Sequence, residues 1–383
     1  MDYFRKSVAL HKKKRGKIEM KSKVTLKSKG DLALAYTPGV AEVCREINSD
    51  PKMSWQLTNR ANQVAVISDG TAILGLGDLG PEAAMPVMEG KAVIFKEFAN
   101  IDAIPLCIAS KETEEIISFC KMIAPSFGGI NLEDISAPRC FEILERLEKE
   151  LSIPVFHDDQ DGTAIITLAA LINACRVTGK VLNKSRVVVN GAGAAGAAIA
   201  HLLLKQGVDD LIVVDSIGIV YAGRPGLNKS KKMMAKESNK NKMKGGLAEA
   251  LVGSDVFVGV SKADLLTEDM VRSMNAAPII FAMANPNPEI MPEAAFRAGA
   301  SIVGTGRSDL PNQINNALVF PGLFRGLLDS GIKHVTLEMK QSVAMAIAYS
   351  IKPSKNKLLP LVTDRKVVKV IRNTLIKNKE KYV

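Results

Sequence analysis

From Asn62 onward, short apolar runs rich in β-branched residues alternate with longer segments of helical periodicity. The runs predict strands over 64–67, 103–109, 153–157, 186–190, 211–215, 256–260, 279–282 and 301–304. The segments between them predict helices, notably over 81–98, 112–124, 162–178 and 194–206. Because strands that alternate with helices usually pair in parallel, the pattern predicts an α/β fold with a doubly wound parallel sheet.

The last part of the chain has a different pattern. After Gly331 the periodicity is purely helical, and its apolar runs at 344–348 and 367–371 predict a tail that packs back on the first domain. A chain of 383 residues with 47% hydrophobic content can bury two ordinary cores, so we expect two domains. The polar stretch 179–185 forms a seam before the second domain.

Composition argues against several classes of protein. The net charge of +11 is concentrated in the lysine-rich stretches 11–23 and 228–244, which lack interleaved aromatic residues. They favour a solvated surface that attracts small anions over one that stacks nucleic-acid bases. The longest apolar stretch, 163–175, is too short to span a bilayer, and the N-terminus lacks the apolar core of a signal peptide. We therefore expect no nucleic-acid partner, no membrane partner and a cytoplasmic location.

The cysteines indicate neither a disulfide framework nor a zinc site. Their number is odd and no CxxC spacing occurs among Cys44, Cys107, Cys120, Cys140 and Cys175. We expect reduced thiols that are mostly buried.

Two segments match the glycine pattern GxGxxG, at 75–80 and 191–196. The second follows the predicted strand 186–190 and opens a helix rich in small residues, so its backbone amides can approach a pyrophosphate. The alternative is a tight turn that binds nothing. The first match is interpreted as a turn that lines a cleft before a helix begins at Pro81. We assign cofactor contacts to the second match, which consists of Gly191, Ala192, Gly193, Ala194, Ala195 and Gly196.

An acid at the end of the following strand indicates which dinucleotide binds. Asp215 closes the predicted strand 211–215, at the spacing expected of a carboxylate that binds the ribose 2′-hydroxyl. Such an acid favours NAD and repels the 2′-phosphate of NADP, and Ser216 rather than an arginine follows it. NAD is therefore the predicted cofactor, while NADP stays open because a neighbouring lysine could receive a phosphate.

Two pairs of adjacent acids, Glu133 with Asp134 and Asp158 with Asp159, stand beside apolar runs. Adjacent carboxylates in apolar surroundings repel each other and resist dehydration, so we expect a hard divalent cation between them. The alternative is surface acids at strand or helix ends, with the first pair capping the helix after Pro138. Two such pairs upstream of a nucleotide loop favour the metal.

With only four histidines in the chain, other side chains must be considered for acid and base chemistry. Lys91 falls on the apolar stripe of the helix that begins at Pro81, whereas Lys96 does not. A buried lysine beside a metal ion loses proton affinity and can act as a general base. The alternative is a side chain that extends along the helix to water.

Further polar residues stand next to predicted turns. Tyr36 precedes the turn at 37–39, where a phenol can donate a proton or merely hydrogen-bond the turn. Asn285, Asn315 and Asn316 end apolar runs and can bind a carboxamide or carboxylate, although each alone is more often a turn or cap.

These segments match a known family. The sequence resembles the malic enzymes, specifically their short bacterial and archaeal form. The likeness covers roughly residues 8 to 335 in order and includes Ala35-Tyr-Thr-Pro-Gly-Val40, Ser68-Asp-Gly-Thr71, Met88-Glu-Gly-Lys91, Gly128-Gly-Ile-Asn-Leu-Glu-Asp-Ile135, Phe156-His-Asp-Asp159, Gly191 to Gly196, Ala284-Asn-Pro-Asn-Pro288 and Pro311-Asn-Gln-Ile-Asn-Asn316. So many ordered motifs are far more specific than any one of them.

The resemblance implies a homodimer that oxidatively decarboxylates L-malate to pyruvate and CO2 while NAD, or NADP, is reduced. Lys91 would be the general base and Tyr36 the general acid, with Asp158 just behind the metal ligands as a third catalytic residue. The ligands of Mg2+ or Mn2+ would be Glu133, Asp134 and Asp159. The nicotinamide end and the substrate carboxylate would contact Asn285 and Asn316, with Asn315 close by.

We accordingly divide the chain into three parts. Residues 1–160 form an N-terminal substrate and metal domain, 161–334 a Rossmann-type NAD(P) domain, and 335–383 a helical segment that returns to the first domain. Alternative functions are a malolactic-type enzyme, an oxaloacetate decarboxylase, or an inactive basic binding protein of the same fold.

The sequence departs from the family pattern at several positions. Asp161 stands where short-form relatives usually carry histidine and would add a fifth carboxylate near the metal. Residues 72–74 lack the arginine that longer relatives use on substrate, and Leu310 replaces a common aromatic residue. The lysine-rich run 228–244 is also unlike the corresponding segment of relatives.

Overall fold

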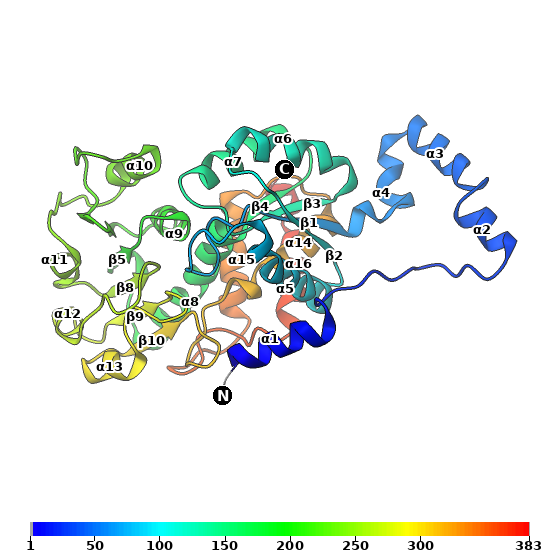
Figure 1. Ribbon diagram of the computed structural model, residues 1–383. Helices are drawn as coiled ribbons and strands as arrows, with labels where there is room; N and C mark the ends of the chain where they lie inside the picture. The colour runs from blue at the N-terminus through cyan, green and yellow to red at the C-terminus, as the bar shows by residue number, and fades with distance from the viewer. Residues whose placement is uncertain (1–2, 383) are drawn as a thin grey trace.

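The computed structural model describes residues 3–382, which form two mainly parallel sheets surrounded by helices (Figure 1). The first sheet has the order β2-β1-β3-β4, in which the strands span Asp102–Cys107, Gln63–Ser68, Gly129–Leu132 and Val155–His157. The second has the order β10-β9-β8-β5-β6-β7, with strands at Ile302–Thr305, Ile279–Ala282, Val256–Gly259, Arg186–Asn190, Asp210–Asp215 and Gly218–Ile219. Only the β6–β7 pair is antiparallel among these described strands.

The predicted α/β fold with a Rossmann-type sheet is confirmed, and every predicted strand is present. Two strands were not predicted, β3 and the two-residue β7. In β3 the apolar run is only four residues long and is interrupted by Asn131, so its pattern is too short to be recognised.

Strand residues of the second sheet alternate between two buried faces. Val187 and Val189 of β5 pack with α8 (Thr163–Thr178) and α9 (Ala194–Lys205). Val188 points the other way, into a core shared with α11 (Leu247–Leu251), α12 (Glu268–Arg272) and α13 (Pro292–Arg297). A strand buried on both faces needs apolar residues throughout, which explains the unbroken apolar runs in the sequence.

The first sheet is covered in the same way. One face packs on α5 (Pro81–Ala99) and α14 (Phe320–Ser330). The other packs on α6 (Thr113–Ile123) and α7 (Arg139–Glu150). The predicted helical tail forms α15 (Leu337–Tyr349), which packs on α8, and α16 (Lys366–Lys377), which packs on α14.

Two of the N-terminal helices, α2 (Lys29–Ala35) and α3 (Val40–Ser49), lie apart from this body (Figure 1). Helix α1 (Tyr3–Lys14) lies near α5, whereas α2 and α3 extend far from both sheets at the end of a long connection (Figure 1). We call residues 18–50 the arm. None of the described side chains of α2 or α3 is buried, so the arm has no core of its own.

The remaining helices are short, apart from α10. They are α4 (Ser54–Leu57), α10 (Lys229–Glu237), the π-turn η4 (Asp158–Gly162) and the 3-10 turns Pro51–Met53, Asn59–Asn62, Ala124–Ser126, Leu182–Lys184, Asn316–Leu318 and Lys379–Lys381. Within residues 3–382, no helix has both the length and the apolar character needed to cross a membrane. The five cysteines are free thiols as predicted, three of them buried.

Candidate active site

Both acidic pairs lie at the carboxyl edge of the first sheet. Glu133 and Asp134 directly follow β3, while Asp158 and Asp159 follow β4 and open the π-turn η4. Strands β3 and β4 are parallel neighbours, so the residues after them meet at one edge. Asp134 has a left-handed backbone, with φ of 54°, and its amide donates to Asp159 Oδ2 at 2.8 Å.

Glu133, Asp134 and Asp159 can point one carboxylate oxygen each at a common point. These oxygens lie within 4.8 Å of one another, and Oδ2 of Asp134 is buried without a hydrogen-bond partner among the described residues. Glu133 and Asp134 are only 2% and 3% exposed, so the alternative of surface acids is wrong. The helix-capping alternative is also wrong, because α7 begins after Pro138 without a side-chain cap.

The charge of this cluster is incompletely balanced. Burial, together with the carboxylates of Asp159 and Asp158, raises the pKa of Glu133 well above its usual range despite nearby Lys91. Burial and Asp159 raise the pKa of Asp134 to about 7. Crowded, dehydrated carboxylates of this kind are stabilised by a hard divalent cation, which takes oxygen ligands. The donor set therefore fits Mg2+ or Mn2+.

Lys91 stands beside the cluster on α5. Its side chain is 12% exposed, lies 2.9 Å from Glu133 Oε1 and donates to Asp158 Oδ2, so it does not extend to water. Burial alone would lower its pKa, but Asp158 and Glu133 outweigh burial and raise the pKa above the usual value. The lowered proton affinity predicted beside a metal therefore requires a cation among the same carboxylates.

Three residues near this edge were missed by sequence reasoning. The buried amide of Asn131 donates to Glu133 Oε2 at 3.1 Å and orients it. His157 is fully buried, with Nδ1 3.8 Å from Asp159 Oδ2, and burial lowers its pKa. Arg139 donates to Asp69 Oδ2 at 2.8 Å and so fixes the turn after β1. The sequence could have indicated these three residues only by their proximity in the chain, since each stands within six residues of an acidic pair.

The second glycine loop connects β5 to α9, as predicted. A Cβ on Gly196 would lie 1.7 Å from the carbonyl oxygen of Gly191, so only glycine permits this close turn. At Gly193, which caps α9, a Cβ would meet no atom within 4 Å. The space over Gly193 and the free amides at the start of α9 fit a pyrophosphate, which argues against a turn that binds nothing.

Asp215 ends β6, but its carboxylate is not free. Arg224 donates to both of its oxygens, and Lys231 Nζ lies 2.6 Å from Oδ2. Burial would raise the pKa of Asp215, but these two cations outweigh burial and hold the pKa well below its usual range. The sequence pointed to Asp215 and to an unspecified neighbouring lysine, but it did not identify Arg224 or Lys231, because neither is adjacent to Asp215 in the chain.

The predicted amides have different positions. Asn316 Oδ1 lies 3.5 Å from Lys91 Nζ, at the acidic cluster. Asn315 accepts from the backbone of Ala317 and thus caps the turn that follows. Asn285 is exposed after β9. Its backbone carbonyl oxygen faces Gly75 of the first glycine match, and a Cβ built on Gly75 would lie 2.4 Å from that oxygen.

Tyr36 is not brought to the cluster within one chain. It follows α2 in the arm and is 64% exposed (Figure 1). The structure therefore unites Lys91, Glu133, Asp134, Asp158 and Asp159 with Asn316, and leaves the predicted acid outside this group.

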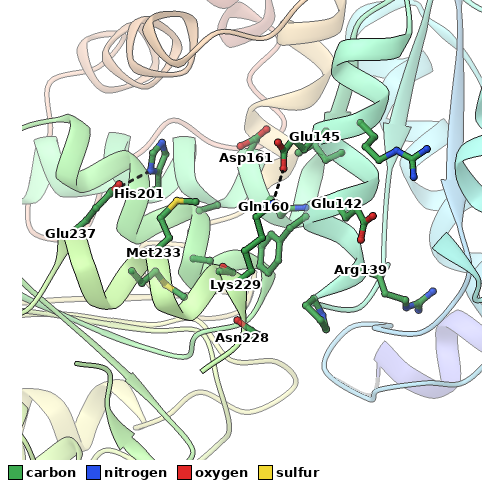
Figure 2. A pocket seen from close by; sticks show the side chains of 18 of the residues that line it. Arg139, Glu142, Glu145, Gln160, Asp161, His201, Asn228, Lys229, Met233 and Glu237 are labelled. Carbon is green, nitrogen blue, oxygen red and sulfur yellow. Dashed lines mark ion pairs between the residues drawn. The ribbon is translucent and has the colours of Figure 1, made fainter. Parts of the chain in front are cut away.

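A cavity of about 740 Å³ lies behind the π-turn, between α7, α9 and α10 (Figure 2). It is crossed by a Lys229–Glu145 pair at 3.9 Å and flanked by a His201–Glu237 pair at 3.8 Å. Asp161 lines this cavity and pairs with Lys340 at 2.7 Å. It lies outside the set of three acids that can share a cation, so the expected fifth carboxylate is balanced by a lysine instead.

The chain is similar to known proteins over nearly its whole length. The family models "Malic enzyme, NAD binding domain" and "Malic enzyme, N-terminal domain" match residues 160–377 and residues 14–114 and 108–148. The "Bifunctional malic/malolactic enzyme" of Bacillus subtilis is 52% identical over 96% of this chain and 91% of its own. An "NADP-dependent malic enzyme" of Haemophilus influenzae is 50% identical over 87% of this chain and 44% of its own, longer sequence. The crystal structure of an NAD-dependent malic enzyme from Thermotoga maritima has a TM-score of 0.94 and 46% identity, covering 97% of this chain and 98% of that one.

Proposed function

The chain belongs to the malic enzyme family, and from this premise we propose that it catalyses the oxidative decarboxylation of L-malate to pyruvate and CO2 with reduction of NAD or NADP. The observation that carries the proposal is the position of Lys91 Nζ, which lies between Glu133 and Asp158 beside three acids that can share a cation. The glycine loop of a Rossmann-type sheet in the same chain supports a dinucleotide as the electron acceptor.

The reaction needs a base at the hydroxyl of malate. We assign this role to Lys91, whose Nζ would take the hydroxyl proton as the hydride leaves the same carbon. Asp158 is fully buried and accepts a hydrogen bond from Lys91, so it positions this amine. Asn316, 3.5 Å from Lys91, is well placed to bind the substrate carboxylate.

The metal would be held by Glu133, Asp134 and Asp159. When bound, Mg2+ or Mn2+ supplies Lewis-acid stabilisation of the negative charge that develops on substrate oxygen. Asn131 and the backbone amide of Asp134 hold two of these carboxylates in place through hydrogen bonds of 3.1 and 2.8 Å. The dinucleotide would lie over Gly193, with Asn285 toward its nicotinamide end.

A proton must return to carbon after CO2 has left, and we assign this step to Tyr36. Because the arm leaves Tyr36 exposed, we propose a homodimer in which the arm of one chain delivers this phenol to the other chain's site. Exposed apolar side chains along the arm support contact with a second copy, since water would otherwise surround Met20, Val24, Leu26, Leu32 and Leu34.

Two further predictions remain part of the proposal. The free cysteines support a cytoplasmic location, and the chain is divided into domains at residues 1–160, 161–334 and 335–383.

The test is direct. Purified protein is mixed with L-malate, Mn2+ and either NAD or NADP, and reduced cofactor and pyruvate are measured. Equal amounts of both products are expected with at least one cofactor. No pyruvate with either cofactor would contradict the proposal. Where a variant that neutralises an acid of the cluster is assayed in the same way, Glu142→Gln, an exposed change on α7, serves as its matched control.

A second candidate function is malolactic conversion, which the bifunctional Bacillus subtilis relative favours. The same groups could serve it. Lactate would form when the reduced dinucleotide reduces pyruvate before it leaves the enzyme. Lactate without net reduced cofactor would identify this reaction, whereas pyruvate in equal amount to reduced cofactor would identify the first.

A further inference from the structure

The segment Ser68-Asp-Gly-Thr71 has no role in the reaction proposed above. In the structure it leads out of β1, which is the parallel neighbour of β3. Because residues that follow parallel neighbours meet at one edge of a sheet, this loop lies beside the acids that follow β3. The backbone amide of Ala72 donates to the carbonyl oxygen of Asp134 at 2.9 Å. The loop after β1 therefore contacts one of the proposed metal ligands through the backbone.

Thr71 gives the same loop a second contact just beyond Asp134. Its hydroxyl accepts a hydrogen bond from the backbone amide of Ser136 at 2.9 Å and donates one to Asp69 Oδ1 at 2.6 Å. Thr71 and Asp69 are only 7% and 1% exposed, so water competes little for these bonds. The contacts of Ala72 and Thr71 together fix the two consecutive peptide groups that follow Asp134.

Arg139 connects this loop with the loops that follow two other strands. Its Nη2 donates to Asp69 Oδ2 at 2.8 Å, to Thr71 Oγ1 at 3.1 Å and to Ser136 Oγ at 3.2 Å. Its Nη1 donates to the carbonyl oxygen of Lys111, which follows β2. A planar guanidinium with five N–H donors can contact several loops at once, which an ammonium group cannot do in the same way. We call Asp69, Thr71 and Arg139 the clasp.

The backbone of Asp134 has a conformation that needs support from its surroundings. Its φ of 54° lies in the left-handed region, which is unfavourable for a residue with a Cβ and persists only where neighbouring contacts impose it. In this conformation the Asp134 amide donates to Asp159 Oδ2 at 2.8 Å, and the two carboxylates can share a cation with Glu133. A return of φ to the ordinary negative region would move the Asp134 carboxylate relative to the other two.

We propose that Thr71 and Arg139 are positioning residues that set the affinity of the site for its divalent cation by holding Asp134 in this conformation. The inference rests on the proposed function, since it concerns the metal site of that same reaction. Thr71 and Arg139 are not among the three acids that can share a cation, so they act through Asp134. Loss of a group that orients a metal ligand typically weakens metal binding about 10- to 100-fold.

Binding of Mn2+ without catalysis is the first test, and calorimetric titration measures it. Thr71→Val keeps the shape of the side chain but removes the hydroxyl, and it should raise the dissociation constant for Mn2+ at least about tenfold. Thr71→Ser retains the hydroxyl and should bind Mn2+ as the wild type does. Arg139→Lys keeps the positive charge but cannot reach all the acceptors of the guanidinium, so it should also weaken binding about tenfold.

The matched control is Thr178→Val at the end of α8, where the hydroxyl donates to the carbonyl oxygen of Ala174 at 2.8 Å. It should leave Mn2+ affinity unchanged. The melting temperature of each variant, measured without metal, separates a loss of stability from a loss of affinity. In malate oxidation, Thr71→Val should raise the KM for Mn2+ about tenfold or more, while kcat at saturating Mn2+ falls less than about threefold. This division is expected because excess cation restores the occupied site, in which Asp134 is again a ligand.

Wild-type affinity for Mn2+ in folded Thr71→Val or in folded Arg139→Lys would overturn the inference. Equal weakening in Thr178→Val would also overturn it, as would a fall in kcat of Thr71→Val with no change in Mn2+ affinity. These outcomes leave the proposed function intact. A wild type that binds no Mn2+ would instead contradict the metal site of the proposed function.

Discussion

The separation of Tyr36 from Lys91 within one chain leads to a complementation experiment. Lys91→Ala and Tyr36→Phe should each reduce malate oxidation about 100- to 10,000-fold as homodimers, because each removes a proton-transfer group. Neither change should unfold the protein, since Tyr36 is exposed and Lys91 is replaced by a good helix former within α5. The two variants are then co-expressed with different tags so that mixed dimers form.

The expected recovery follows from the arrangement of the arm. If each site combines Lys91 of one chain with Tyr36 of the other, a mixed dimer has one site with both groups and one with neither. Random association makes about half of the dimers mixed, so the mixture should recover about one quarter of wild-type activity. Purified mixed dimers should show about half. If both groups came from one chain, every site would lack one of them and no recovery would occur.

A double variant provides the control. Chains carrying both Lys91→Ala and Tyr36→Phe are mixed with wild-type chains in equal amounts. Exchange of the arm inactivates both sites of every mixed dimer, which leaves about one quarter of full activity, against about one half without exchange. Sedimentation verifies that dimers have formed. No recovery in the first mixture together with one half in the second would refute the exchanged arm.

Three further outcomes are expected. Glu133→Gln should weaken Mn2+ binding more than about tenfold by calorimetry and abolish stabilisation by Mn2+, while Glu142→Gln leaves both unchanged. Gly196→Ala should lower the melting temperature because its Cβ would lie 1.7 Å from Gly191 O, whereas Gly193→Ala should fold normally and bind the dinucleotide more weakly. Burial raises the pKa of Glu148 to about 7, so the folded state holds its proton and loses stability as pH rises from about 4.5 through 7. Glu148→Gln should therefore stabilise the protein by up to about 3 kcal/mol at pH 8 and not at pH 4, and equal shifts at both pH values would contradict this.

Much of the fold follows from local pattern. The strands of the second sheet are buried on both faces, and their apolar runs are long enough to stand out in the sequence. Helix α5 could be placed because Met88, Ala92 and Phe95 recur at helical spacing, which also placed Lys91 toward the core. Strand β3 was not predicted because polar Asn131 interrupts its apolar run. The side chain of Asn131 instead donates a hydrogen bond to Glu133.

The site was predictable where chemistry depends on neighbours in the chain. Adjacent carboxylates beside apolar runs are visible in sequence, and the structure brings both pairs to one sheet edge, where Glu133, Asp134 and Asp158 are buried and Asp159 is partly exposed. Partners from distant segments were not visible. Lys340 neutralises Asp161 across 179 positions, and Arg224 and Lys231 reach Asp215 from a loop and from the following helix. Spacing along the chain identifies a single acidic residue. The ionisation of that residue depends on all the charged and apolar groups that surround it in the fold.

The π-turn from Asp158 to Gly162 has a consequence for how this protein can change over generations. Its first two residues serve the acidic cluster, and the next two, Gln160 and Asp161, line the cavity on the opposite side. Residues of one five-residue turn thus contribute to both the acidic cluster and the cavity. An insertion or deletion there would alter both compartments at once, so neither side can drift independently of the other.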